Sequence, residues 1–181
     1  MLVVVRHGRT ESNASGLLLG RADPPLDDVG REQASALAAL VPDAARVVSS
    51  PLQRCVATAS VFGPDVEVDD RWIELDYGEW DQTPLSSLPA ETWARWREDL
   101  HLRPPGGETI AELGERVRAA CDDLAADAAE RDVVVVTHVS PFKAAMAWAM
   151  GVGDEVCWRI HVSPASLVRI AIRGDRPSLV V

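Results

Sequence analysis

Short apolar runs alternate with amphipathic segments along the chain, and several of the runs end abruptly at polar residues. Residues 2–5 form a continuous and largely β-branched run, which predicts a short buried strand that stops at Arg6. Comparable runs predict further strands at residues 46–49, 66–68 and 132–137. A terminal hairpin is predicted for residues 166–172 and 179–181, with its turn at Gly174 and Asp175.

Apolar residues recur at helical spacing between these strands. Residues 29–40 predict one amphipathic helix, and Thr109 with Glu112 forms a capping-box pattern that predicts another helix reaching about residue 130. Ser50 before Pro51 resembles a serine cap followed by proline at the first helical position, which predicts a helix from there to Phe62. Residues 141–150 predict a buried helix closed by Gly151.

The alternation of strands and helices predicts an α/β fold with a mostly parallel central sheet and helices on both faces. Ligands of such sheets bind outside the carboxyl ends of the strands. His7 and His138 each follow a predicted strand, so both are expected at that edge. The proline-rich and tryptophan-rich stretch at about 70–107 predicts an excursion that covers the same edge.

Composition narrows the range of functions. A chain of 181 residues with 47% hydrophobic and 25% charged residues is typical of one globular domain, here residues 1–181. The net charge of −10 disfavours nucleic acid as a partner. An anionic substrate therefore requires some of the 18 basic residues to be concentrated in one pocket.

Other sequence features indicate the cellular setting. The N-terminal apolar run lacks the basic start and the length of a signal peptide, and no apolar stretch is long enough to cross a membrane, so we expect a cytoplasmic protein with no membrane partner. Cys55, Cys121 and Cys157 form no CxxC pair, which argues against a disulfide framework and against a zinc site. The sequence is compatible with a homodimer but does not determine the oligomeric state.

Three short strings carry candidate chemistry. Residues 6–13 read Arg-His-Gly-Arg-Thr-Glu-Ser-Asn, residues 49–54 read Ser-Ser-Pro-Leu-Gln-Arg, and Thr137-His138 ends a predicted strand. An imidazole beside guanidinium groups suits a phosphate, and Gly8 would let the backbone approach a ligand closely. Each string alone is weak evidence, but the three together are specific.

These strings resemble the histidine phosphatase superfamily, also called the phosphoglycerate mutase-like family, and the resemblance continues in order over nearly the whole chain. The further matching pieces are the loop 20–26, Thr58-Ala59, Glu74 with residues 78–80, residues 106–109 and His138. The resemblance implies the fold of that family and a metal-independent phosphatase of the histidine acid phosphatase type. It implies no cofactor, and a small phosphomonoester as the substrate.

The resemblance also implies catalytic roles. His7 would attack phosphorus and become a phosphohistidine, while Arg6, Arg54 and His138 would stabilise the phosphoryl oxygens. Glu74 would protonate the leaving group and then activate water, with Asp76 and Glu79 as rival carboxylates.

Several residues remain as secondary candidates for substrate contacts. Asn13 would add a neutral donor to phosphate, and Arg21 lies in a loop that follows the catalytic string. Val139 replaces the glycine usual after the second histidine, and Leu19 replaces a common glutamine. Trp93 and Trp96 are expected either in the core or in a lid, whereas His101 and His161 have no motif around them.

Two other functions fit the same family: phosphoryl transfer of the phosphoglycerate mutase type, and a non-catalytic phosphate-binding signalling domain. The short chain, with few basic residues between its motifs, favours a phosphatase over a mutase. The tryptophans at 70–107 predict a leaving group that is partly apolar or aromatic, rather than a phosphoglycerate or a phosphoprotein. The string Val136 to Pro141 resembles phosphatases of the alpha-ribazole phosphatase type, so alpha-ribazole phosphate is the first candidate substrate.

Overall fold

The computed structural model describes residues 1–174 and 176–180, so Asp175 in the predicted hairpin turn and Val181 lie outside the described residues. Its centre is a six-stranded sheet with the order β3-β2-β4-β1-β5-β6. The strands are β1 (Leu2–Arg6), β2 (Arg46–Ser49), β3 (Val66–Val68), β4 (Val133–Thr137), β5 (Leu167–Arg173) and β6 (Arg176–Val180). β1 to β4 are mutually parallel, whereas β5 runs antiparallel to both β1 and β6.

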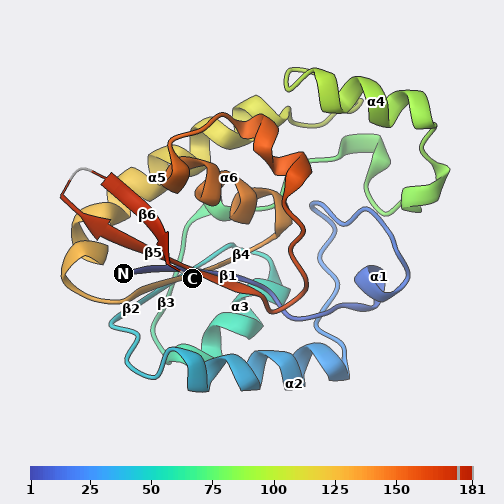
Figure 1. Cartoon of the computed structure of the whole chain (residues 1–181). Coiled ribbons are helices and arrows are strands. Elements are labelled where there is room, and N and C mark those ends of the chain that lie inside the picture. The colour runs from blue at the N-terminus through green and yellow to red at the C-terminus, as the bar shows by residue number, and fades with distance from the viewer. Residues whose placement is uncertain (175, 181) are drawn as a thin grey trace.

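Helices cover both faces of this sheet, as the sequence pattern predicts. The α-helices are α1 (Glu11–Ala14), α2 (Asp28–Leu37), α3 (Gln53–Ala59), α4 (Ala90–Glu98), α5 (Ile110–Glu130) and α6 (Val139–Met150). Figure 1 shows α2 and α3 on one side of the sheet and α5 and α6 on the other. Short 3₁₀ segments are η1 (Ala38–Leu40), η2 (Ser60–Phe62), η3 (Asp70–Trp72), η4 (Gly78–Trp80), η5 (Leu85–Ser87) and η6 (Asp154–Arg159).

The continuous apolar runs of β1 and β4 are explained by burial on both faces. In β1, Leu2 and Val4 belong to the hydrophobic cluster beneath α5 and α6, while Val3 and Val5 belong to the cluster beneath α2 and α3. A strand that is covered on both sides needs apolar residues at every position, so it loses the alternation of a half-exposed strand.

Local signals located several element boundaries, but α6 begins at Val139 where Pro141 was predicted, and β6 begins at Arg176 where Leu179 was predicted. The capping box of Thr109 and Glu112 is present at the start of α5, and Gly151 ends α6 in a left-handed conformation. The predicted helix start at Ser50 and Pro51 is wrong, because α3 begins at Gln53 and has Leu52 as its N-cap. The hydroxyl of Ser50 lies against His138 instead.

The excursion between β3 and α5 contains η3, η4, η5 and α4 and is organised by tryptophans. The Trp96 ring is 2% exposed and lies 5.4–5.9 Å, between ring centroids, from the rings of Tyr77, Trp80, Trp93 and Trp158. Trp96 is therefore a core residue, which is one of its two predicted placements.

Candidate active site

Two neighbouring parallel strands bring the histidines together. β1 pairs with β4 so that Arg6 lies opposite Thr137, and the backbone N–H of His7 donates to the Thr137 carbonyl at 2.9 Å. His7 and His138 therefore follow equivalent strand ends, with their ring centroids 5.1 Å apart. Both side chains are buried.

The surroundings of His7 favour a neutral imidazole with one free nitrogen. Its Nδ1 lies 2.6 Å from the carbonyl oxygen of Gly8. A carbonyl oxygen only accepts hydrogen bonds, so Nδ1 carries the proton and Nε2 has the lone pair. Burial and the charges of Arg54 and Arg6 hold the pKa of His7 well below its usual value.

Gly8, which follows His7, allows the close packing of two backbone segments. A Cβ atom on Gly8 would lie 2.3 Å from the carbonyl oxygen of Gly30, near the start of α2. The close approach that Gly8 permits is therefore between two backbone segments, where the sequence had suggested an approach to a ligand. A residue with a Cβ atom would prevent this packing directly after β1 and His7.

Arg6 and Arg54 are buried cations whose nearest partners are mostly carbonyl groups. Arg6 Nη1 donates to the Val162 carbonyl at 2.7 Å, and Arg54 donates to the carbonyls of Ala22 and Gly20 at 2.7 and 2.8 Å. The Nε atoms of both arginines are buried without a partner among the described residues. The pKa of both groups is lowered, mainly because burial desolvates the charged form. An anion bound here would compensate this cost.

His138 is held by a residue that directly follows β2 and by a residue of α3. Ser50 Oγ lies 2.7 Å and Cys55 Sγ lies 3.3 Å from His138 Nε2. Burial and the charge of Arg54 keep the pKa of His138 well below its usual value. The sequence interpretation missed Ser50 as a partner of His138, although its position at the end of a strand was a usable signal.

Glu74 is the buried carboxylate among the three candidates. It accepts hydrogen bonds from the backbone N–H groups of Leu75, Val139 and Ser140 at 2.7, 3.0 and 3.2 Å. Two of these donors belong to the N-terminus of α6, where the helix dipole favours a negative charge. The side chain of Glu79 is exposed, and that of Asp76 is partly exposed and accepts from the Gly78 N–H.

The backbone that carries Glu74 is held by an arginine that sequence reasoning missed. Arg116, on α5, donates to the carbonyls of Arg71, Ile73 and Glu74 at 2.6, 2.8 and 3.3 Å. Two nitrogens of its guanidinium group also pair with Glu108, at 2.7 and 2.8 Å. Glu108 lies in the matched string 106–109, which was the available signal for this contact.

The secondary candidates fall in different places. The backbone N–H of Thr10 donates to the amide oxygen of Asn13 at 3.1 Å. This hydrogen bond completes a capping box at the start of α1. Arg21 pairs weakly with Glu108 at 3.5 Å and lies in the loop held by Arg54. Val139 lines the pocket described below. His101 and His161 are exposed.

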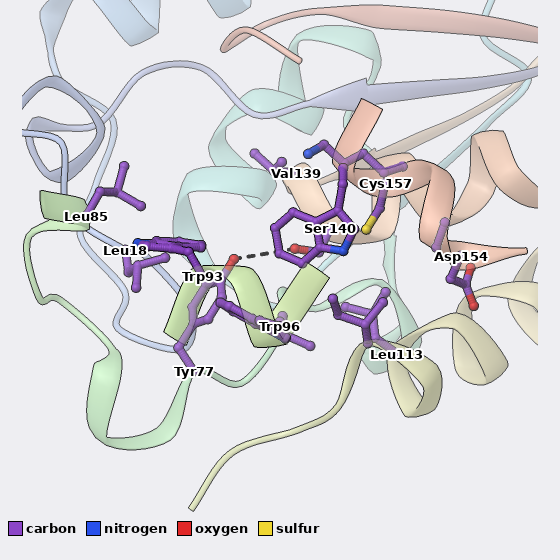
Figure 2. Close-up of a pocket in the computed structure, with 15 residues that line it drawn as sticks. Leu18, Tyr77, Leu85, Trp93, Trp96, Leu113, Val139, Ser140, Asp154 and Cys157 are labelled. Carbon is purple, nitrogen blue, oxygen red and sulfur yellow. Dashed lines mark hydrogen bonds between the residues drawn. The ribbon is translucent and has the colours of Figure 1, made fainter. Parts of the chain in front are cut away.

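An aromatic pocket lies beside this centre. Its volume is about 190 Å³, and its wall includes Leu18, Tyr77, Trp93, Trp96, Val139 and Ser140. Figure 2 shows Tyr77, Trp93 and Trp96 on one side of the cavity and Val139, Ser140 and Cys157 on the other. Because Val139 and Ser140 also donate to Glu74, the pocket adjoins the buried carboxylate.

The match to a family covers nearly the whole chain. The family model of the histidine phosphatase superfamily (branch 1) matches residues 2–181, so the chain belongs to this superfamily. The resemblance recognised from the catalytic strings is thereby confirmed.

Individual relatives agree with this assignment. A bifunctional protein of Mycobacterium tuberculosis is 36% identical over 99% of this chain and 52% of its own length, so the chain spans about half of that relative. Phosphoserine phosphatase 1 of Hydrogenobacter thermophilus is 32% identical, with 91% of this chain and 83% of that protein covered. The mycobacterial glucosyl-3-phosphoglycerate phosphatase complexed with VO3 superimposes with a TM-score of 0.89 at 29% identity, over 99% of this chain and 96% of that chain.

Proposed function

We propose that the protein hydrolyses the phosphomonoester of a small metabolite through a phosphohistidine on His7. The observation that carries this proposal is a neutral imidazole, with Nε2 free, beside two buried arginines whose Nε atoms lack partners. A neutral imidazole has a lone pair with which to attack phosphorus, and the neighbouring arginines attract the phosphate dianion.

The reaction proceeds in two steps, phosphoryl transfer to His7 and hydrolysis of the phosphohistidine. His7 Nε2 attacks phosphorus, the bond to the ester oxygen breaks, and the protonated form of Glu74 gives its proton to the leaving oxygen. Water then attacks the phosphohistidine, Glu74 takes a proton from that water, and the nitrogen–phosphorus bond breaks to release inorganic phosphate. Arg6, Arg54 and His138 stabilise the charge on the phosphoryl oxygens during both steps. Asn13 adds a neutral donor, and Arg21 and Val139 contact the rest of the substrate.

The named relatives support a small phosphorylated metabolite as the substrate. Phosphoserine and glucosyl-3-phosphoglycerate appear in the names of phosphatases similar to this chain. The pocket has room for a small leaving group, and its aromatic wall favours a leaving group that is partly apolar. A positive charge supplied by two arginines makes a metal ion unnecessary for this chemistry.

The test is hydrolysis of an aryl phosphate by the wild-type chain and by His7→Ala, each before and after exhaustive chelation. We expect the wild type to release inorganic phosphate and to form an acid-labile phosphoenzyme, and His7→Ala to do neither. His101→Ala, which alters an exposed histidine, is the matched control and should keep full activity.

Three results would contradict parts of the proposal. Residual turnover in His7→Ala would exclude this nucleophile. A rate that collapses with chelator and returns with a divalent ion would exclude the metal-independent mechanism. Transfer of the phosphoryl group to a second metabolite, without release of phosphate, would indicate a mutase.

A further inference from the structure

The chain's single lysine lines the aromatic pocket. Lys143 is partly buried on α6 and makes no hydrogen bond or ion pair with any residue in 1–174 or 176–180. Among the residues that line this pocket, it is the one with a cationic side chain. A half-buried ammonium group without a partner is uncommon, because its desolvation is normally offset by an anion.

The position of Lys143 relates it to the reaction centre. It lies four residues after Val139, so the two side chains project from the same face of α6, one turn apart. The backbone of Val139 holds Glu74, which we propose protonates the leaving group. Lys143 thus borders the space into which that leaving group extends.

The other titratable groups of the pocket wall do not neutralise Lys143. Asp154 makes no ion pair with Lys143: its Oδ2 pairs with Arg118 at 2.5 Å, and its Oδ1 is buried without a hydrogen-bond partner among the described residues. Burial raises the pKa of Cys157 to about 11 and raises that of Tyr77 still further, so both groups are uncharged at neutral pH. Burial also lowers the pKa of Lys143, and the charge of Glu74 opposes this shift.

We propose that Lys143 binds a carboxylate on the leaving group, so that the preferred substrate is a phosphomonoester of an acidic alcohol or phenol. The apolar part of the leaving group packs against the tryptophans, and the carboxylate pairs with the ammonium group. The proposal rests on the proposed function, since it specifies the substrate of that reaction. It also revises one expectation from the sequence, which favoured a partly apolar leaving group over an acidic one such as a phosphoglycerate: the cation comes from α6, outside the excursion at 70–107.

The experiment compares two isosteric substrates, carboxyphenyl phosphate and carbamoylphenyl phosphate, each as the meta and the para isomer. They share an aromatic ring and differ mainly in charge, so their ratio of kcat/KM measures recognition of the carboxylate. We expect the wild type to favour the carboxylate by about tenfold or more for at least one isomer. Lys143→Met should bring this ratio close to one, mainly through KM, whereas Lys143→Arg should retain a preference.

The matched control is Arg159→Met, which removes an exposed cation nearby in the chain and should leave the ratio unchanged. An unchanged ratio in Lys143→Met, or no preference in the wild type, would overturn the proposal. An equal loss of kcat/KM for both substrates would also overturn it, because Lys143 would then act on the phosphoryl group that the two share. A wild-type chain that hydrolyses neither substrate would instead contradict the proposed function.

Discussion

At the scale of single residues, burial has different effects on the charge of the four basic side chains of the site. His7 and His138 become neutral, because burial and the neighbouring arginines lower the pKa of each imidazole. Arg6 and Arg54 retain their charge even when buried, since the guanidinium group is hardly ever deprotonated in proteins. The cluster therefore combines an uncharged imidazole, the proposed nucleophile, with two cationic guanidinium groups.

Glu74→Gln should separate proton transfer from phosphate binding. We expect kcat to fall about a hundredfold or more for an alkyl phosphate, because its alkoxide leaves poorly without a proton. The loss should be much smaller for a nitrophenyl phosphate, whose phenolate leaves unaided, and vanadate should bind nearly as tightly as to the wild type. The measurement is steady-state kinetics over a series of leaving groups.

Glu79→Gln is the matched control, because that carboxylate is exposed, and its kinetics should stay at wild-type values. An equal loss of kcat for alkyl and aryl substrates in Glu74→Gln would rule out its role as the general acid.

At the scale of elements, α5 and α6 both position the carboxylate of Glu74, one through its backbone and the other through its side chain. The N-terminus of α6 binds the side chain of Glu74 through two backbone N–H groups. Arg116 on α5 binds the backbone that leads to Glu74 and is itself oriented by Glu108. A partly buried guanidinium group that satisfies three carbonyls holds an irregular segment firmly, since those carbonyls have no strand or helix partner.

Arg116→Met should reproduce the signature of Glu74→Gln in weaker form. We expect kcat for alkyl phosphates to fall about tenfold to a hundredfold, with little change in KM, because a small displacement of Glu74 weakens proton transfer. Aryl phosphates with good leaving groups should be affected much less. Kinetics over the same leaving groups provide the measurement.

Arg131→Met serves as the control, because Arg131 is the C-cap of the same helix and the substitution disrupts its pair with Asp127 at the far end of α5. If Arg116→Met slowed alkyl and aryl substrates alike, the residue would contribute to stability without positioning Glu74.

At the scale of the whole molecule, the charge distribution supports the proposed binding of a phosphate by an acidic protein. The net charge is −10, yet Arg6 and Arg54 are buried together and their partners are mainly carbonyl groups. The concentration of positive charge that the sequence demanded is thus present at the strand ends.

Within residues 1–174 and 176–180, no helix is long and apolar enough to span a membrane, and no cluster of three or more metal-ligating side chains is found.

The buried histidines should also make stability depend on pH. The unfolded chain protonates its histidines near pH 6.5, whereas folded His7 and His138 resist protonation, so below that pH the unfolded state binds more protons. The free energy of unfolding should therefore fall as the pH drops from about 7 to about 5.5, by up to roughly 1.4 kcal/mol per pH unit for each histidine. Urea unfolding at several pH values measures this slope.

His138→Gln should make the slope shallower, while His101→Gln, at an exposed position, should leave it unchanged. A free energy of unfolding that stays constant over this range would show that the two imidazoles are protonated as readily in the folded chain.

The sequence by itself determined the order of the elements, the mostly parallel sheet and the placement of His7 and His138 at strand ends. These properties depend on local signals, such as apolar runs, helical spacing and the capping box of Thr109, which involve residues a few positions apart. The proposal of Glu74 as the general acid came from resemblance to a family, because no local pattern distinguishes it from Asp76 or Glu79.

Only the tertiary structure decided which groups complete the site. Ser50 contacts His138 across 88 positions, and Arg116 reaches the backbone of Glu74 across 42. Gly8 faces Gly30, and Lys143 enters the pocket beside the tryptophans of a distant segment. Such contacts arise when separate elements pack together, and no periodicity within one element specifies its partner on another.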